Sequence, residues 1–178
     1  MRNDHSPGIV RPAIAGDLAW IGEQELAPPN RGKVGSFDVE THRLNLAASD
    51  YRYLIQEDAR GERVGFAILR GLDSRARAVE LLRIVATKPG HAHGRSLLQS
   101  ILATTLGGNG YSRLWLQVVS HNERAIRIYE QLGFVREGCL RRHYMTADGV
   151  TCDLIVFGML REEYRHAAER LPATPVEG

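Results

Sequence analysis

The residues best suited to binding chemistry lie in a tight turn between an apolar run and an amphipathic helix. The run from Glu80 to Thr87 leads into this turn, and leucine and isoleucine recur at helical spacing from Leu97 onward. Small residues in such a turn leave backbone N–H groups exposed at the positive end of a helix, which favours an anion. We therefore predict a pyrophosphate-binding turn made of Gly90, His91, Ala92, His93, Gly94 and Arg95. The alternative for this turn taken alone is an ordinary glycine-rich connection of an α/β fold.

A second segment places a tyrosine where its phenol could serve a reaction. The apolar run Leu114 to Val119 precedes a helix that opens at Asn122 and carries Tyr129 two turns later. A phenol can donate a proton to a leaving group. An asparagine at this position can contact a ligand, cap the helix, or do both. Tyr129 also falls on the apolar stripe of its helix, so a purely structural aromatic is the alternative to a catalytic one.

Together these two segments resemble the GNAT superfamily of acetyl-CoA-dependent N-acetyltransferases. The family's phosphate turn is matched at Gly94, whereas Pro89 replaces its first Gln or Arg and Ala92 replaces its first Gly. Weaker similarity extends from Ile9 to Met159. The family's second signature, an Asn that opens a helix followed by Ala, Tyr and Gly-Phe at set distances, is complete in Asn122, Ala125, Tyr129, Gly133 and Phe134.

The resemblance implies acetyl-CoA as the co-substrate and assigns roles to residues in both segments. The thiol leaving group would lie near Tyr129, and Asn122 would reach the pantetheine arm. A bulge in the fourth strand would separate it from the fifth, so that the backbone of Ile84 and Val85 could pair with the pantetheine amides as another strand would. Both are also β-branched core residues, which is compatible with that role because the pairing uses backbone groups. Pro89 predicts a modest loss of cofactor affinity, since backbone donors do most of the phosphate binding.

The base that would deprotonate the acceptor amine has several candidates. Glu80 stands on the fourth strand where some family members carry a basic glutamate, and burial there would make its carboxylate a stronger base. The alternative is an exposed residue of an alternating strand. The chain is also similar to the ribosomal-protein alanine acetyltransferases, but Gln117 occupies the position of their acid and cannot accept a proton. His121 or a water chain could serve instead, although a histidine near a helix start is more often a capping or surface residue.

Apolar periodicity and turn residues predict the elements that position these side chains. The predicted strands cover 9–14, 51–56, 64–70, 75–87, 111–119, 134–145 and 150–159, and the predicted helices cover 18–27, 38–47, 93–106 and 122–132. The resemblance implies that they form one α/β (α+β) GNAT domain over 1–178, with a core at 8–160 and a charged tail at 161–178. Its mixed central sheet of about seven strands would carry helices on both faces, with strands four and five splayed apart.

Composition agrees with a single small domain. A chain of 178 residues with 43% hydrophobic residues can bury a substantial core. The net charge is +2 with scattered cations, so no nucleic-acid partner is expected. No segment reaches the length of a membrane span and residues 1–8 lack an apolar signal core, so we expect no membrane association and a cytoplasmic location.

His91 and His93 lack further ligands at metal-binding spacing, so no metal is expected. The edge of the last hairpin could pair two subunits as a homodimer.

The primary hypothesis is an N-acetyltransferase that moves the acetyl group of acetyl-CoA to a primary amine of a small molecule or peptide by direct attack. Tyr129 would act as general acid and Glu80 as general base. Residues 25–37 and the last hairpin would shape the acceptor site, because loops decide specificity. A non-catalytic acyl-CoA-binding or sensing module with the same fold is the alternative. A nucleotide-binding domain is disfavoured, because neither a Walker Lys-Ser/Thr nor the acidic residue of a Rossmann unit is in place.

Overall fold

The computed structural model describes residues 9–88, 92–108, 110–146 and 148–169, and it contains a mixed seven-stranded sheet. The strands are β1 (Ile9–Pro12), β2 (Tyr51–Glu57), β3 (Arg63–Arg70), β4 (Ala78–Ala86), β5 (Arg113–Val119), β6 (Val135–Met145) and β7 (Thr151–Leu160). Their order across the sheet is β1-β2-β3-β4-β5-β7-β6. Neighbouring strands are antiparallel except for β4 and β5, which run parallel.

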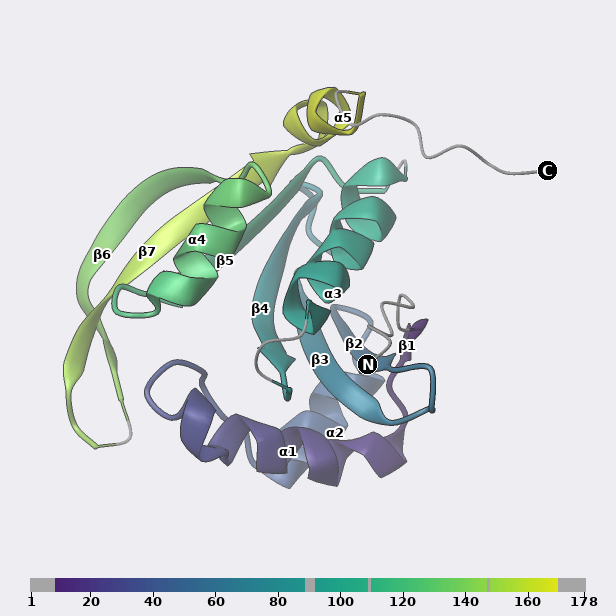
Figure 1. The fold of residues 1–178 in the computed structure, drawn as a ribbon, viewed down its shortest axis with the longest axis vertical. Helices are drawn as coiled ribbons and strands as arrows, with labels where there is room; N and C mark the ends of the chain where they lie inside the picture. Colours follow the sequence, from purple (N-terminus) through teal and green to yellow (C-terminus); the bar gives the residue numbers. More distant parts are fainter. Residues whose placement is uncertain (1–8, 89–91, 109, 147, 170–178) are drawn as a thin grey trace, which may run out of the picture.

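Helices cover both faces of this sheet (Figure 1). They are α1 (Leu18–Leu26), α2 (Val39–Ala47), α3 (His93–Leu102), α4 (Glu123–Gln131) and α5 (Arg161–Glu169). Short 3-10 turns occupy Ala15–Asp17 and Pro28–Asn30, and a π-helical turn, Ala103–Gly107, continues α3 where the sequence predicted a longer α-helix. No helix among the described residues is long and apolar enough to span a membrane.

Alternation along β3 divides the core in two. Phe66 and Ile68 belong to a core that includes side chains of α1. The intervening residues, Ala67 and Leu69, belong to a second core with α3 and α4. A strand buried on both faces is apolar at successive positions, which explains the unbroken run at 64–69. The predicted fold, with about seven strands and helices on both faces, is confirmed.

The predicted separation of the fourth and fifth strands has a local cause. Ile68 pairs with Arg83 but the next residue of β3 pairs with Leu81, so Leu82 is an extra residue on β4. Such a bulge bends the strand that carries it. Pairing of β4 with β5 ends at Leu81 and Leu116, and the two strands diverge beyond that point (Figure 1).

The charged segment after the last strand is helical at its start, which differs from the predicted tail. Arg161–Glu169 form α5, whose first turn carries Glu162 and Glu163 at the end that favours acids. The carboxylate of Glu163 accepts the Leu160 N–H at 2.8 Å. Tyr164 packs against the core below α3. The high charge of this segment therefore belongs to the solvated face of a helix that Tyr164 anchors to the core.

Candidate active site

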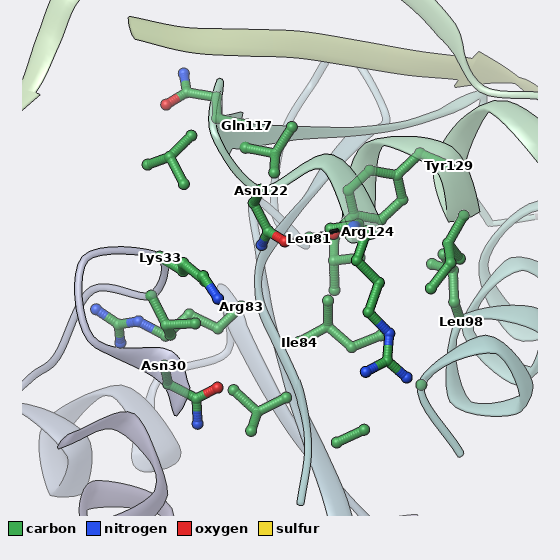
Figure 2. Close-up of a pocket in the computed structure, with 18 of the residues that line it drawn as sticks. Asn30, Lys33, Leu81, Arg83, Ile84, Leu98, Gln117, Asn122, Arg124 and Tyr129 are labelled. Atoms are coloured by element: carbon green, nitrogen blue, oxygen red, sulfur yellow. Dashed lines mark hydrogen bonds between the residues drawn. The ribbon is translucent and has the colours of Figure 1, made fainter. Parts of the chain in front are cut away.

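A cavity of about 630 Å³ opens where β4 and β5 diverge (Figure 2). One end, which we call the loop-side mouth, is formed by the loop at 29–35 together with Arg83, Gln117 and Tyr144. The other end, the helix-side mouth, lies between the start of α3 and the first turns of α4, where Arg124 is found. The cavity therefore passes through the sheet between its two helical layers.

At Ile84 and Val85 the wall contributed by β4 offers backbone groups rather than polar side chains. Ile84 and Val85 line the cavity on the part of the strand that no longer pairs with β5. Their side chains pack elsewhere, Val85 with the α1 core and Ile84 against the α3 core. A strand edge of this kind can hydrogen-bond an extended ligand as though it were another strand.

Tyr129 lies on α4 with its ring in the core and lines the cavity. Its side chain packs against Phe134 and Phe157, with ring centroids 5.8 and 5.9 Å away. Burial raises the pKa of the Tyr129 phenol well above its ordinary value, so the group is protonated near neutral pH. None of the described residues hydrogen-bonds the hydroxyl. The structural and the functional interpretation of this residue therefore both fit the packing.

Asn122 caps α4, as one of its two predicted roles requires. Its side-chain oxygen accepts the Ala125 N–H at 3.4 Å. Its carboxamide also points into the cavity between the strands (Figure 2). No described residue accepts a hydrogen bond from the Asn122 NH₂, and the pantetheine contact stays a prediction.

The predicted pyrophosphate turn is described in part. Ala92, Gly94 and Arg95 line the cavity, and His93 begins α3 outside the cavity wall. A β-carbon on Gly94 would lie 3.4 Å from that of Ala86, so glycine here also lets α3 approach β4 closely. Two further members of the predicted turn, Gly90 and His91, lie outside the described residues together with Pro89.

A comparison with protein-family models identifies the family of this chain. Residues 20–134, more than half of the chain, match the model of the Acetyltransferase (GNAT) family. The chain belongs to this family. The match includes most of α1, the cavity-lining part of β4, the turn before α3 and the whole of α4.

Curated relatives match this GNAT chain over short segments. The uncharacterized N-acetyltransferase YokL of Bacillus subtilis, derived from prophage SPbeta, is 44% identical over 54 residues, which are 30% of each chain. The ribosomal protein bS18-alanine N-acetyltransferase of Escherichia coli K12 is 41% identical over 56 residues, 32% of this chain and 37% of the relative. The matches thus span about a third of each relative.

Solved structures of spermidine N-acetyltransferases from Vibrio cholerae share the GNAT fold of this chain. A chimera of that enzyme with hSSAT superposes with a TM-score of 0.80 at 21% identity, covering 90% of this chain and 99% of the other. The complex with CoA and spermine has a TM-score of 0.76 at 23% identity, with 90% and 99% coverage. At these identities the likeness establishes the fold alone.

Glu80, the predicted base of the GNAT chain, is buried and already paired. Its side chain is 8% exposed, which excludes the exposed alternative. Arg70 on the neighbouring strand donates its Nε–H to the Glu80 carboxylate at 2.9 Å. Glu80 lines the cavity, and both Arg70 hydrogen bonds reach its Oε2, so Oε1 accepts from no described residue. His121 is exposed and lies outside the cavity wall, whereas Gln117 is part of it.

Several cavity residues of the GNAT chain were not predicted from the sequence. Arg124 reaches past Ile84 toward the start of α3 (Figure 2), and it pairs with no described residue. Its position two residues after Asn122 was the available signal. Lys33 and Tyr144 lie in the two segments predicted to shape the acceptor site, residues 25–37 and the last hairpin, but no motif singles them out. Among the described residues, no group of three His, Cys, Asp or Glu side chains could hold a metal ion.

A buried polar network supports the loop-side mouth. Glu25 pairs with Arg83 at 2.9 Å and with the His42 Nε2 at 3.1 Å. Glu25 also accepts the Phe37 N–H at 3.0 Å, and the other ring nitrogen of His42 lies 3.0 Å from the Tyr53 hydroxyl. The Arg83 guanidinium stacks over the Phe37 ring at 3.8 Å. Burial lowers the pKa of Arg83, an effect that the Glu25 carboxylate opposes. This network fixes the end of the loop that borders the cavity.

Proposed function

We propose that the protein transfers the acetyl group of acetyl-CoA to a primary amine of a small molecule or peptide by direct attack. The observation that carries this proposal is the protonated hydroxyl of Tyr129, which pairs with no described residue, in a cavity walled by the strand edge of β4 beyond its pairing with β5. In the reaction the amine nitrogen attacks the thioester carbonyl carbon, and the C–S bond breaks as the C–N bond is completed. Tyr129 donates its proton to the departing sulfur.

The cofactor would lie along the cavity in an extended form. Ile84 and Val85 would hydrogen-bond the pantetheine amides through their backbone, and Asn122 would contact the same arm. The phosphates would lie at the helix-side mouth, where Ala92, Gly94 and Arg95 begin α3 and its N–H groups and dipole favour an anion. Gly90 and His91 belong to the same proposed turn, and His93 follows them in sequence.

Glu80 is the proposed base, and its ion pair with Arg70 gives the proposal a direct test. A base role requires the carboxylate itself, so Glu80→Gln should lower kcat by about 10²-fold. Arg70→Gln retains the carboxylate and should retain most of the activity. Equal losses in both variants would instead assign Glu80 a structural role in the pair, and His121 or water would take the proton.

Two measurements on the intact chain test the proposed activity. Thermal unfolding with acetyl-CoA, CoA or ATP reports binding, because a ligand that binds the folded state raises the melting temperature. Thiol release from acetyl-CoA in the presence of an amine panel reports transfer. Stabilisation by both CoA forms but not by ATP, with amine-dependent thiol release, is expected. Stabilisation without thiol release from any amine would identify an acyl-CoA-binding or sensing module.

A further inference from the structure

Among the residues that the structure describes, the loop-side mouth of the cavity carries one cation that no carboxylate neutralises. Of the charged side chains in this half of the wall, Arg83 is paired with Glu25 at 2.9 Å and Glu80 is paired with Arg70. Lys33 is the third. Within the described residues its ammonium donates to the Pro29 carbonyl oxygen at 3.4 Å and meets no acid. Figure 2 shows the Lys33 side chain directed across the mouth toward β4.

The other cavity cations are engaged or distant from this mouth. Lys88 is held by Asp58 at 3.2 Å and by Glu62 at 2.9 Å. Arg95 and Arg124 belong to the helix-side mouth, where the proposed cofactor phosphates would lie. Lys33 is therefore available to bind a ligand that enters the cavity beside the loop at 29–35.

This distribution of charges disfavours the binding of a polycationic acceptor. A polyamine keeps further ammonium groups beyond the one that reacts, and these need carboxylates at close range. The described cavity wall contains one carboxylate, that of Glu80, and Arg70 already neutralises it. An additional ammonium would instead meet Lys33. The neutral polar groups of Asn30, Gln117 and Tyr144 complete the mouth and can hydrogen-bond an uncharged or anionic group.

We propose, building on the proposed acetyl transfer, that the acceptor is a primary amine that also carries an anionic group, a carboxylate or a phosphate, and that Lys33 binds this group. The chain would then share its fold with spermidine N-acetyltransferases but not their class of acceptor. Lys33 is a specificity-determining residue in this assignment, and it takes no part in the transfer itself.

Matched acceptor pairs test this proposal through thiol release from acetyl-CoA. The members of each pair differ in the anionic group: amino acids against their carboxamides, O-phosphoethanolamine against ethanolamine, with spermidine as the polycation. Rates are compared at equal concentrations of neutral amine, because the anion also changes the basicity of the amine. The anionic member of at least one pair should give a kcat/KM about tenfold higher than its neutral partner. The two pairs distinguish carboxylate from phosphate. The preference should weaken as ionic strength rises, because the lysine is exposed.

Variants of the loop then locate the effect. Lys33→Gln should remove the preference and Lys33→Glu should reverse it, while Arg31→Gln, an exposed cation of the same loop outside the cavity wall, should leave it unchanged. Equal turnover of each pair, or a preference for spermidine, would overturn the inference while acetyl transfer itself stands. No thiol release with any amine would overturn the proposed function and this assignment with it.

Discussion

Tyr129 meets a packing requirement and a chemical one with different atoms of the same side chain. Its ring fills the space between Phe134 and Phe157, and its hydroxyl belongs to the cavity wall. The raised pKa keeps the proton on oxygen, which suits a donor and does not suit a base. The two roles can be separated because phenylalanine retains the ring and lacks the hydroxyl.

We expect Tyr129→Phe to lower kcat by about 10²-fold at saturating acetyl-CoA, because the thiolate loses its proton donor. The melting temperature should change little, since the ring contacts are kept. Tyr164→Phe on α5, outside the cavity wall, is the matched control and should leave turnover unchanged. Thiol release measures both. Unchanged turnover in Tyr129→Phe would remove the hydroxyl from the mechanism.

The lowered pKa of Asp17 makes the free energy of unfolding depend on pH. Its buried carboxylate accepts from Arg11 at 2.7 Å and from the Ile14 N–H at 2.9 Å, and Arg63 lies 3.3 Å away. The Arg11 hydrogen bond chiefly lowers the pKa of Asp17 below its ordinary value of 3.8. A lowered pKa in the folded state means that this stabilisation is complete above pH 3.8 and is lost as the pH falls through the folded-state pKa.

We therefore expect Asp17→Asn to cost about 1–2 kcal/mol of unfolding free energy at pH 7, a modest value because both arginines are partly exposed. The difference from the parent protein should shrink as the pH falls below 3.8. Urea unfolding over this range measures it, with Glu23→Gln on the exposed side of α1 as the control. A difference that does not vary with pH would contradict the assigned charge effect.

At the scale of elements, α3 and α4 form the two sides of the helix-side mouth. Arg95 of α3 donates to the Gln131 carboxamide of α4 at 2.8 Å, which joins the helices at one point. Arg124 extends from α4 toward the start of α3 and pairs with no described residue. The Arg124 guanidinium is therefore available to the proposed cofactor phosphates. Pro89, which replaces the family's Gln or Arg, offers them no side-chain donor.

We expect Arg124→Ala to weaken acetyl-CoA binding by about tenfold, because it removes a charge-assisted hydrogen bond to phosphate. Arg127→Ala is the matched control, since Arg127 lies one turn further along α4 and pairs with Glu123 outside the cavity. Calorimetric titration with acetyl-CoA gives both dissociation constants. Equal affinity in the two variants would show that the phosphates do not reach Arg124.

The three strands β5, β7 and β6 are joined by an ion pair that crosses the middle strand. Arg113 on β5 donates to Glu137 on β6 at 2.5 Å, above Gly158 of β7. A β-carbon on Gly158 would lie 2.6 Å from the Arg113 Nη1 and 2.7 Å from the Glu137 carboxyl carbon. Space for the ion pair, rather than backbone conformation, therefore favours glycine here.

We expect Gly158→Ala to lower the unfolding free energy by about 1 kcal/mol, because flexible side chains can move aside but lose their contact. Gly138→Ala on β6 is the matched control, since nothing lies within 4 Å of its added β-carbon. Urea unfolding measures both variants. A control as destabilised as Gly158→Ala would assign the cost to the sheet backbone instead of the ion pair.

At the scale of the whole molecule, the sheet consists of two parts joined along a short parallel seam. The seam pairs Ala78–Leu81 of β4 with Arg113–Leu116 of β5, and the cavity begins where it ends. The α1 and α2 layer supplies the loop-side mouth, and the opposite layer supplies the helix-side mouth. An acceptor and a cofactor that enter from opposite mouths would thus meet between the strands, near Tyr129.

The sequence by itself determined the order and type of nearly all elements and the second family signature. Seven strands and four of the five helices follow from spacing and turn residues, because both depend on neighbours along the chain. Asn122 as a helix cap and Tyr129 on the buried stripe were readable for the same reason. The helix after β7 was missed, because its charged composition resembles a solvated tail and its one anchor, Tyr164, is visible only when packed.

Tertiary structure decided which charges are neutralised and where the cavity opens. Glu80 pairs with Arg70 and Arg83 pairs with Glu25, partners brought together by strand register and by the position of α1. Lys33 differs from these two residues because it meets no acidic side chain among the described residues. Local periodicity carries no information about such contacts, since they depend on the register between strands and on how α1 packs against the sheet.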